Sequence, residues 1–192
     1  KPAHLLRFGI MGYHYAKKIM GIDNPRVGLL SNGEENTKGN EATLAAFPQL
    51  QAAGINFIGN IEGRDIFSGN TDVIVCDGFT GNIVLKAGEG MASSLLKMIK
   101  EEITRSYLAK LGMIMAAPAL KELKKRIDYR EYGGAPFLGV NGVSIACHGS
   151  STANAIKNAV RLARDSVDNY LVESIRESME NMKSRRAGGI IA

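Results

Sequence analysis

Residues 25–35 read Pro25-Arg26-Val27-Gly28-Leu29-Leu30-Ser31-Asn32-Gly33-Glu34-Glu35, and this stretch decides the fold class of the chain. The apolar run from Val27 to Ser31 is short and continuous, which is typical of a buried strand. A polar loop follows to Asn40, and residues 42–53 then have a helical pattern that Gly54 ends. A strand, a polar loop and a helix in this order form the unit from which parallel α/β sheets are built.

The same unit recurs in both directions from this stretch. Further strands are expected at residues 56–59, 73–76 and 143–147. Further helices are expected at residues 5–20, about 81–106, 120–127 and about 151–182. We therefore predict an α/β fold with a mostly parallel, Rossmann-like sheet sandwiched between helices and joined by right-handed crossovers.

The predicted organisation is one domain with an extension. Residues 1–182 are expected to form part of a single α/β domain, from which a long helical segment at about residues 95–130 protrudes. Residues 183–192 are expected to be a disordered tail. Because the chain opens at Lys1-Pro2 rather than at a methionine, we expect a processed, truncated or incomplete product.

The composition excludes several classes of protein. The chain has 192 residues, of which 45% are hydrophobic and 22% charged, as in ordinary globular proteins. The net charge of +5 suits an anionic partner but is too small to indicate nucleic-acid binding. Cys76 and Cys147 have no metal-ligand spacing, and a reducing, cytoplasmic compartment is expected. No apolar run is long enough to span a membrane.

Three loops follow predicted strands, and parallel sheets bind ligands at the carboxyl ends of their strands. The first loop, residues 32–40, contains two carboxylates, two glycines and Lys38. One interpretation is an anion or phosphoryl site in which Lys38 supplies the positive charge. The other is a solvated loop that caps the next helix through Asn40.

The second loop reads Asp77-Gly78-Phe79-Thr80-Gly81-Asn82 and leads into a helix. A helix N-terminus has unpaired N–H groups and a partial positive charge, so it favours phosphate or a developing oxyanion. Lys86 is expected about one turn into that helix, within reach of the same anion. The alternative is a tight turn with an Asp or Asn cap. The spacing of glycine and lysine differs from that of a Walker loop.

The third loop reads His148-Gly149-Ser150-Ser151-Thr152 and again opens a helix. Neighbouring residues of a strand point to opposite faces, so Cys147 is expected in the core and His148 facing the loop. His148 has either a catalytic or a structural hydrogen-bonding role. Ser150 or Ser151 is expected to cap the helix in either case.

Two further segments suggest contacts with partners. Apolar residues 107–119 precede a basic segment, which favours either a membrane surface or hydrophobic partner, or helix packing in a dimer. That basic segment contains Lys121, Lys124, Lys125 and Arg126. Lys157, Arg161 and Arg164 share one face of the last predicted helix, which either meets an acidic partner or is simply solvated.

These motifs, in this order and at this spacing, resemble the PlsX family of phosphate acyltransferases over residues 1–175. The match is carried by residues 1–6, 25–30, Gly33-Glu34-Glu35, Lys38-Gly39-Asn40, residues 77–82, Lys86, Tyr132-Gly133-Gly134-Ala135 and His148-Gly149-Ser150-Ser151. Members of that family have a longer N-terminal portion, so this chain resembles their C-terminal portion. The pair Ser31-Asn32 ahead of Gly33 is a minor departure from the family pattern.

The resemblance implies an acyltransferase that moves a fatty acyl group from acyl carrier protein to inorganic phosphate in bacterial phospholipid synthesis. It implies a fold similar to those of phosphotransacetylases and isopropylmalate dehydrogenases. It also implies a homodimer, peripheral contact with the membrane, and delivery of the acyl phosphate to a membrane glycerol-3-phosphate acyltransferase. No metal, nucleotide or other cofactor is expected.

The residue types fit this chemistry. Phosphate is already an anionic nucleophile, and a thiol with a pKa of about 8.5 is a good leaving group, so positioning and fixed positive dipoles matter most. The catalytic candidates are His148, Lys86 and Ser150. The substrate-binding and phosphate-binding candidates are Asn32, Glu34, Lys38, Asn40, Asp77, Gly78, Gly81, Asn82, Gly149 and Ser151.

Three alternatives stay open. A phosphotransacetylase-like enzyme would use an acyl-CoA thioester for the same reaction. A dehydrogenase is disfavoured, because no Gly-x-Gly-x-x-Gly follows a strand with an acidic residue at the required distance. A non-catalytic module that binds anions or membranes would account for the apolar and basic segments without turnover.

Overall fold

The structure, a computed structural model, describes residues 1–127 and 133–187. Its centre is a three-stranded sheet in the order β2-β1-β3, and β1 pairs in parallel with both neighbours. The strands are β1 (Val27–Leu30), β2 (Phe57–Ile61) and β3 (Val73–Val75). The α/β, Rossmann-like fold class predicted from the sequence is thereby confirmed.

Two helices, α1 (Pro2–Lys18) and α2 (Glu41–Gln51), pack against this sheet and against each other. The core between them is apolar and fully enclosed. It contains Leu5, Leu6 and Ile10 of α1, Val27 and Leu29 of β1, Val75 of β3, and Ala46 and Leu50 of α2. Val27 and Leu29 face the same side because side chains alternate along a strand. The buried run that the sequence indicated therefore lies at the middle of the molecule.

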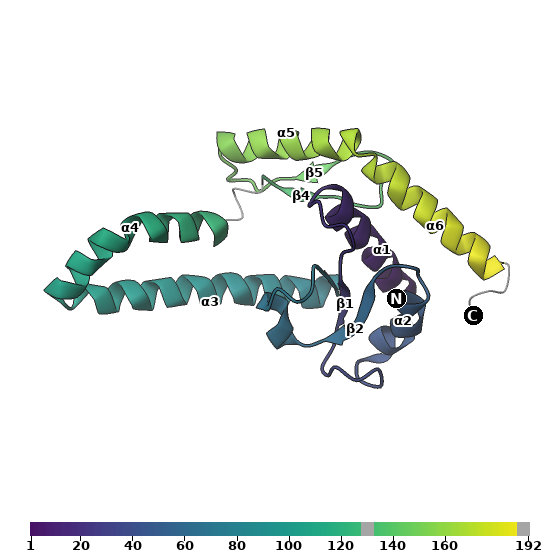
Figure 1. The fold of residues 1–192 in the computed structure, drawn as a ribbon, viewed down its shortest axis with the longest axis horizontal. Helices are drawn as coiled ribbons and strands as arrows, with labels where there is room; N and C mark the ends of the chain where they lie inside the picture. Colours follow the sequence, from purple (N-terminus) through teal and green to yellow (C-terminus); the bar gives the residue numbers. More distant parts are fainter. Residues whose placement is uncertain (128–132, 188–192) are drawn as a thin grey trace.

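A second pair of helices leaves the sheet. After the short helix η1 (Gly63–Phe67) and β3, α3 (Gly78–Thr104) and α4 (Tyr107–Ile127) form a hairpin that extends away from the other elements (Figure 1). The sequence predicted a protruding helical segment in this region. Between residue 106 and the end of this segment, a helix was expected only at residues 120–127, whereas α4 begins at Tyr107 and continues through Pro118.

The predicted fourth strand does not join the parallel sheet. Only β5 (Ile145–Ala146) forms from the apolar run 143–147, and it pairs antiparallel with β4 (Ala135–Pro136) in a separate two-stranded sheet. The segment that supplies β4 was expected to be a loop. An apolar run indicates a strand but does not identify its partner, because that choice depends on residues far away in the sequence.

The last predicted helix is two helices, α5 (Ala153–Asp168) and α6 (Leu171–Ala187). The chain turns between them at Tyr170, whose φ of 55° is in the left-handed region that ends a helix. The sequence has no glycine or proline at this point to mark the break. Helix α6 also continues to Ala187, into the predicted tail, and residues 188–192 lie outside the described part of the chain.

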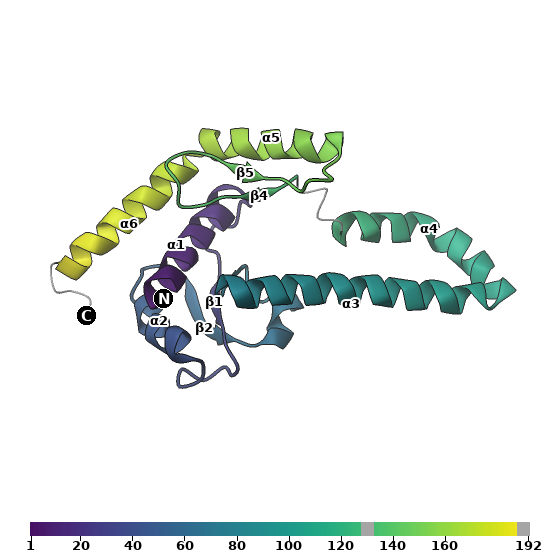
Figure 2. The ribbon, with the colours of Figure 1, turned by 180° about the vertical axis from the view of Figure 1, so that it is seen from behind.

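The C-terminal helices return to the start of the chain. Helix α6 packs against α1, and Met11, Leu171 and Ile175 form a second apolar cluster between them. Figure 2 shows α5 and α6 together with β4 and β5 as a layer next to α1, on the opposite side from α2. The beginning and the end of the chain therefore belong to one folded unit.

Candidate functional site

The first two predicted loops lie at the same edge of the sheet. Strands β1 and β3 are parallel neighbours, so the loops that follow them, residues 31–40 and 76–77, leave the sheet side by side. Strand β2 is parallel to β1 on its other side and ends at the same edge. The general rule for ligand binding in parallel sheets selects this edge as the candidate site.

The loop between β1 and α2 is anchored at its end by a helix cap. The side chain of Asn40 accepts a hydrogen bond from the backbone N–H of Thr43 at 2.9 Å. The capping function predicted as one alternative for Asn40 is therefore present. Asn32, Glu34 and Lys38 are exposed at the same edge, where they are accessible to a ligand.

Arg64 is a site residue that the sequence analysis did not select. It follows β2 at the candidate edge, and its guanidinium lies 2.9 Å from the carboxylate of Glu34 and 3.1 Å from that of Glu62. The hydrogen bond that Arg64 donates to Glu34 and the neighbouring negative charges raise the pKa of Arg64. The signal was its place after the second strand, because parallel sheets bind ligands at the carboxyl ends of their strands.

Asn60 is a second residue at this edge that the sequence did not indicate. It is buried, with only 7% of its surface exposed. Its side-chain amide donates to the backbone carbonyl of Glu35 at 2.8 Å and to that of Lys38 at 3.3 Å. Because both partners can only accept, the nitrogen of the amide must face the loop. Its oxygen has no hydrogen-bond partner among the described residues. Asn60 thus joins the end of β2 to the loop that carries Glu34 and Lys38.

The loop after β3 is capped by Asp77. One carboxylate oxygen accepts from the backbone N–H of Phe79 at 2.9 Å and of Thr80 at 3.0 Å, and the other accepts from the Thr80 hydroxyl at 2.6 Å. The Thr80 hydrogen bonds are the main cause of the lowered pKa of Asp77. The N–H of Gly81 donates to the carbonyl of Asp77 at 2.9 Å. The Asp77 carboxylate therefore occupies the N–H groups of Phe79 and Thr80, which were expected to bind an anion at this helix N-terminus.

The positions of the remaining residues on α3 differ from expectation. The helix begins at Gly78, ahead of the predicted start at Gly81, and Asn82 is exposed in its first turns. Lys86 is exposed and comes eight residues after Gly78, which corresponds to about 12 Å along the helix axis. Lys86 is thus more than two turns into the helix, and not about one turn.

Cys76, directly before this cap, is half-buried. Burial, and to a lesser degree the charge of Asp77, raise the pKa of its thiol. A raised pKa disfavours the thiolate that a cysteine nucleophile needs. Its half-buried position and raised pKa are those of a packing residue.

The third predicted loop contains a histidine–serine pair. His148 Nδ1 lies 2.7 Å from Ser150 Oγ and accepts the backbone N–H of Ser150 at 3.1 Å. Because Nδ1 accepts this N–H, it is unprotonated, so the Ser150 hydroxyl donates to it and the neutral ring has its proton on Nε2. The helix cap is neither Ser150 nor Ser151 but Thr152, which accepts from the N–H of Ala155 at 3.3 Å.

This third loop does not leave the parallel sheet, because β5 belongs to the other sheet. The structure thus brings Asn32, Glu34, Lys38 and Asn40 together with Asp77, Gly78, Gly81 and Asn82. His148, Gly149, Ser150 and Ser151 instead follow a strand of the two-stranded sheet, and Lys86 lies further along α3. Cys147 is exposed instead of buried in the core. Tyr132 of the neighbouring motif lies outside the described residues.

In residues 1–127 and 133–187, no three His, Cys, Asp or Glu side chains lie close enough together to hold a metal ion. Across these same ranges, no helix has the length and apolar character needed to cross a membrane.

Comparisons with known proteins agree with the motifs. A sequence model of the family described as "Fatty acid synthesis protein" matches residues 1–174. A protein of Pelotomaculum thermopropionicum named "Phosphate acyltransferase" is 69% identical over 189 residues, which is 98% of this chain and 55% of that protein. A protein of Heliobacterium modesticaldum with the same name is 62% identical over 92% of this chain and 53% of its own length. The chain thus spans about half the length of these curated relatives.

Proposed function

Since this chain belongs to the fatty acid synthesis protein family, which is the PlsX family that its motifs resemble, we propose that the complete protein is a phosphate acyltransferase. It transfers a long-chain fatty acyl group from acyl carrier protein to inorganic phosphate, for use in phospholipid synthesis. The observation that carries this proposal is the 69% identity to a protein named phosphate acyltransferase over nearly the entire chain.

The proposed reaction is an acyl transfer without a cofactor. An oxygen of phosphate attacks the thioester carbonyl, a C–O bond forms, and the C–S bond breaks so that the thiolate of the carrier leaves. With a thiol pKa of about 8.5, the thiolate needs little assistance from an acid. The protein must hold an anionic nucleophile next to a carbonyl that becomes anionic, which positioned cations and N–H dipoles achieve.

We assign phosphate binding to the carboxyl edge of the parallel sheet, with Lys38 and Arg64 as the cations. Arg64 is 70% exposed and its ion pairs with Glu34 and Glu62 are at the surface. Exposed ion pairs contribute little free energy, so phosphate can compete for this guanidinium. Lys86 is assigned a weaker, longer-range electrostatic effect because of its place along α3.

His148 and Ser150 are proposed to act at the thioester. The Ser150 hydroxyl is directed to Nδ1, so the donor nitrogen of the neutral ring is Nε2. An N–H donor of this kind can orient the thioester carbonyl or stabilise its developing negative charge. Gly149 and Ser151 complete this loop.

The assay that tests the function is acyl phosphate formation by the complete protein from a palmitoyl thioester of acyl carrier protein and phosphate, with palmitoyl-CoA in parallel. Phosphate-dependent product from the carrier-protein thioester is expected. Product from acyl-CoA alone would instead indicate a phosphotransacetylase-like enzyme. Absence of product from both, with a folded protein, would leave the non-catalytic binding module.

Lysine variants test the assignment of the phosphate site. Lys38→Ala is expected to raise the KM for phosphate at least tenfold, and Lys86→Ala to raise it less. Lys97→Ala is the matched control, because Lys97 lies further along α3 in a surface pair with Glu101. The assignment of Lys38 fails if its variant retains the KM of the wild type, and that of Lys86 fails if activity and phosphate affinity are both unchanged.

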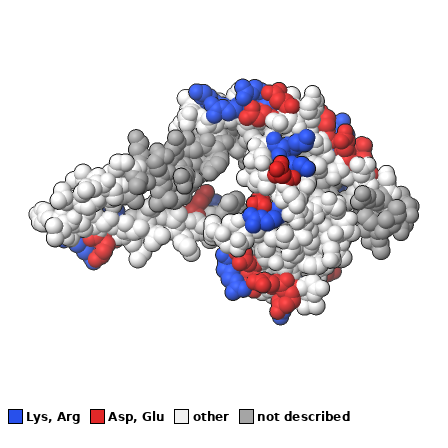
Figure 3. Space-filling view, viewed as in Figure 1, with Lys and Arg blue, Asp and Glu red and all other residues white. Residues whose placement is uncertain are grey.

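We further infer that the α3–α4 hairpin makes the contacts with a membrane or with a second copy in the homodimer. Large apolar side chains are exposed along it, including Leu95 at 55%, Met98 at 64%, Leu108 at 83% and Met115 at 81%. The part of the hairpin visible in Figure 3 has mostly uncharged side chains on this face. Peripheral attachment at the cytoplasmic side would place the product near a membrane glycerol-3-phosphate acyltransferase.

Two measurements separate these contacts. Leu108→Glu is expected to reduce co-sedimentation with anionic phospholipid vesicles, because it introduces a charge on an apolar surface. Met20→Glu, at an exposed position beyond α1, is the control. If Leu108→Glu instead converts a dimer to a monomer in sedimentation equilibrium and leaves vesicle binding intact, the surface is a dimer interface.

A further inference from the structure

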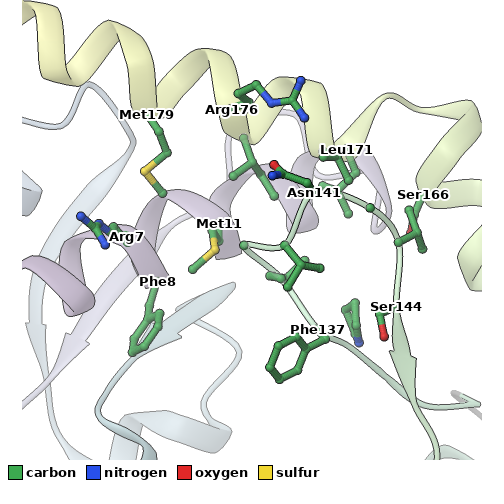
Figure 4. A pocket seen from close by; sticks show the side chains of 18 of the residues that line it. Arg7, Phe8, Met11, Phe137, Asn141, Ser144, Ser166, Leu171, Arg176 and Met179 are labelled. Atoms are coloured by element: carbon green, nitrogen blue, oxygen red, sulfur yellow. The ribbon is translucent and has the colours of Figure 1, made fainter.

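An apolar cavity of about 630 Å³ lies between α1, the segment after β4 and α6. Figure 4 shows its walls, with Phe8 and Met11 on α1, Phe137 on the opposite segment, and Leu171 and Met179 on α6. Its volume is within the range of about 300–1,000 Å³ that is typical of sites for small ligands. The candidate site at the sheet edge does not use these residues.

The lining of this cavity has the chemistry of an amphiphile site. Most of the side chains are aliphatic, aromatic or thioether groups. Ser166, the most deeply buried polar residue of the wall, already donates its hydroxyl to the carbonyl of Leu162 at 2.7 Å. It therefore does not need a polar ligand group inside the cavity.

The charges around the cavity all have one sign. Arg7 of α1 and Arg176 of α6 both line it and are exposed, so their guanidinium groups lie at its rim. No aspartate or glutamate in the described parts of the chain lines it. An apolar interior with cations at the mouth is complementary to an alkyl chain that ends in an anionic group.

The cavity also lies toward the two candidate loops. Helix α1 runs opposite to β3, because the position of Gly12 is next to Val73 and that of Gly9 is next to Val75. Ala3, His4 and residues 6–8, which line the cavity, therefore extend past the carboxyl end of β3, where the loop at Asp77 begins. The opposite wall, residues 137–144, continues directly into β5 and His148.

We propose that this cavity binds the alkyl chain of a long-chain acyl ligand, and that Arg7 and Arg176 attract the carboxylate of a free fatty acid at its mouth. The inference rests on the proposed acyl transfer, for which it identifies the site of the acyl chain. Burial of each further methylene group in such a site strengthens binding about fourfold. The depth of the cavity then limits which chain lengths the protein accepts.

Substitution of Val140 tests the cavity by reducing its volume. Val140 lines the cavity but is 39% exposed on a loop, so Val140→Trp adds an indole without replacing a core residue. The complete protein is assayed with butyryl, octanoyl and palmitoyl thioesters of acyl carrier protein. We expect kcat/KM to fall at least tenfold for palmitoyl and to remain within twofold for butyryl.

The matched control is Val160→Trp, which makes the same change at a 65% exposed position of α5 that does not line the cavity. It should leave the chain-length profile unchanged. An unchanged profile for a folded Val140→Trp would overturn the proposal. No turnover of any thioester by the wild type would instead contradict the proposed function, and the cavity would then be judged by binding alone.

The binding measurement uses a palmitic acid analogue with a diazirine at its methyl end, cross-linked to the complete protein and mapped by peptide mass spectrometry. Cross-links are expected within residues 136–144 or in α6. Arg176→Gln should weaken binding of the same probe at least tenfold without moving the cross-links. Cross-links elsewhere, as expected if other residues of the complete protein fill the cavity, would overturn the proposal even if Val140→Trp does not fold.

Discussion

Asn60 shows how one side chain can control a loop that is distant in sequence. Its amide holds the carbonyls of Glu35 and Lys38, and the residue is almost completely buried. A buried amide that lost these partners would leave polar groups unpaired, which costs about 1–3 kcal/mol. The position of Lys38 at the candidate phosphate site thus depends on a residue of β2.

Asn60→Asp tests this dependence. The variant keeps the shape of the side chain but places a carboxylate oxygen against two carbonyl oxygens. We expect the free energy of unfolding to fall by about 2 kcal/mol and the KM for phosphate to rise, with the KM for the acyl donor unchanged. Chemical denaturation and steady-state kinetics measure the two effects.

Asn56→Asp is the control for this substitution. Asn56 donates to the carbonyl of Asn24 at 3.1 Å, and this contact is exposed at the opposite end of β2. Asn56→Asp should change the free energy of unfolding and the KM for phosphate less than Asn60→Asp does. If the two variants raise the KM for phosphate equally, Asn60 has no specific effect on the loop.

At the scale of elements, the packing of α1 on the sheet depends on two glycines. A Cβ atom at Gly9 would be 2.6 Å from Leu50 Cδ2, and one at Gly12 would be 2.5 Å from Val73 Cγ1. Both distances are shorter than carbon atoms tolerate, so the helix lies as close to α2 and β3 as its backbone allows. The close approach fixes the wall of the apolar cavity that α1 contributes.

Gly12→Ala is therefore expected to destabilise the protein by about 1–3 kcal/mol through overpacking. Gly90→Ala is the opposite case, because Gly90 is exposed in α3 and a Cβ atom there meets nothing within 4 Å. Alanine should stabilise that helix by up to about 1 kcal/mol. Urea denaturation measures the free energy of unfolding of each variant. A Gly12→Ala variant as stable as the wild type would contradict the close approach of α1 to β3.

At the scale of the whole molecule, stability in acid depends on the ion pair that ties β1 to the segment before β3. Asp72 accepts from the side chain of Arg26 at 2.9 and 3.0 Å and from its backbone N–H at 2.8 Å. The Arg26 hydrogen bonds lower the pKa of Asp72 to about 2. A carboxyl group with a lowered folded-state pKa stabilises the protein above its unfolded pKa and loses this effect as the pH falls.

We expect this contribution to be complete above about pH 4 and to disappear between about pH 4 and pH 2. Asp72→Asn should lower stability at pH 7 by about 1 kcal/mol, since the pair is partly exposed, and should have a smaller effect at pH 2. Thermal unfolding across this range is the measurement. Asp23→Asn, at an exposed carboxylate before β1, serves as the control. An equal loss of stability for Asp72→Asn at both pH values would exclude the linkage.

The sequence by itself determined the strands β1, β2 and β3 with the helices around them, the parallel α/β class and the family of this chain. It also indicated that Asn40 and Asp77 are possible helix caps, and both caps are present. These features follow from residues close together in the chain, where hydrophobic periodicity, glycines and capping side chains act locally.

Only the tertiary structure decided the partner of β5, the break at Tyr170, the roles of Asn60 and Arg64, and the cavity under α6. Each depends on contacts between segments that are distant in sequence. Asn60 meets a loop more than twenty residues before it, and the cavity is built from both ends of the chain. The local pattern of the sequence does not predict such contacts, because they depend on the packing energy of the complete fold.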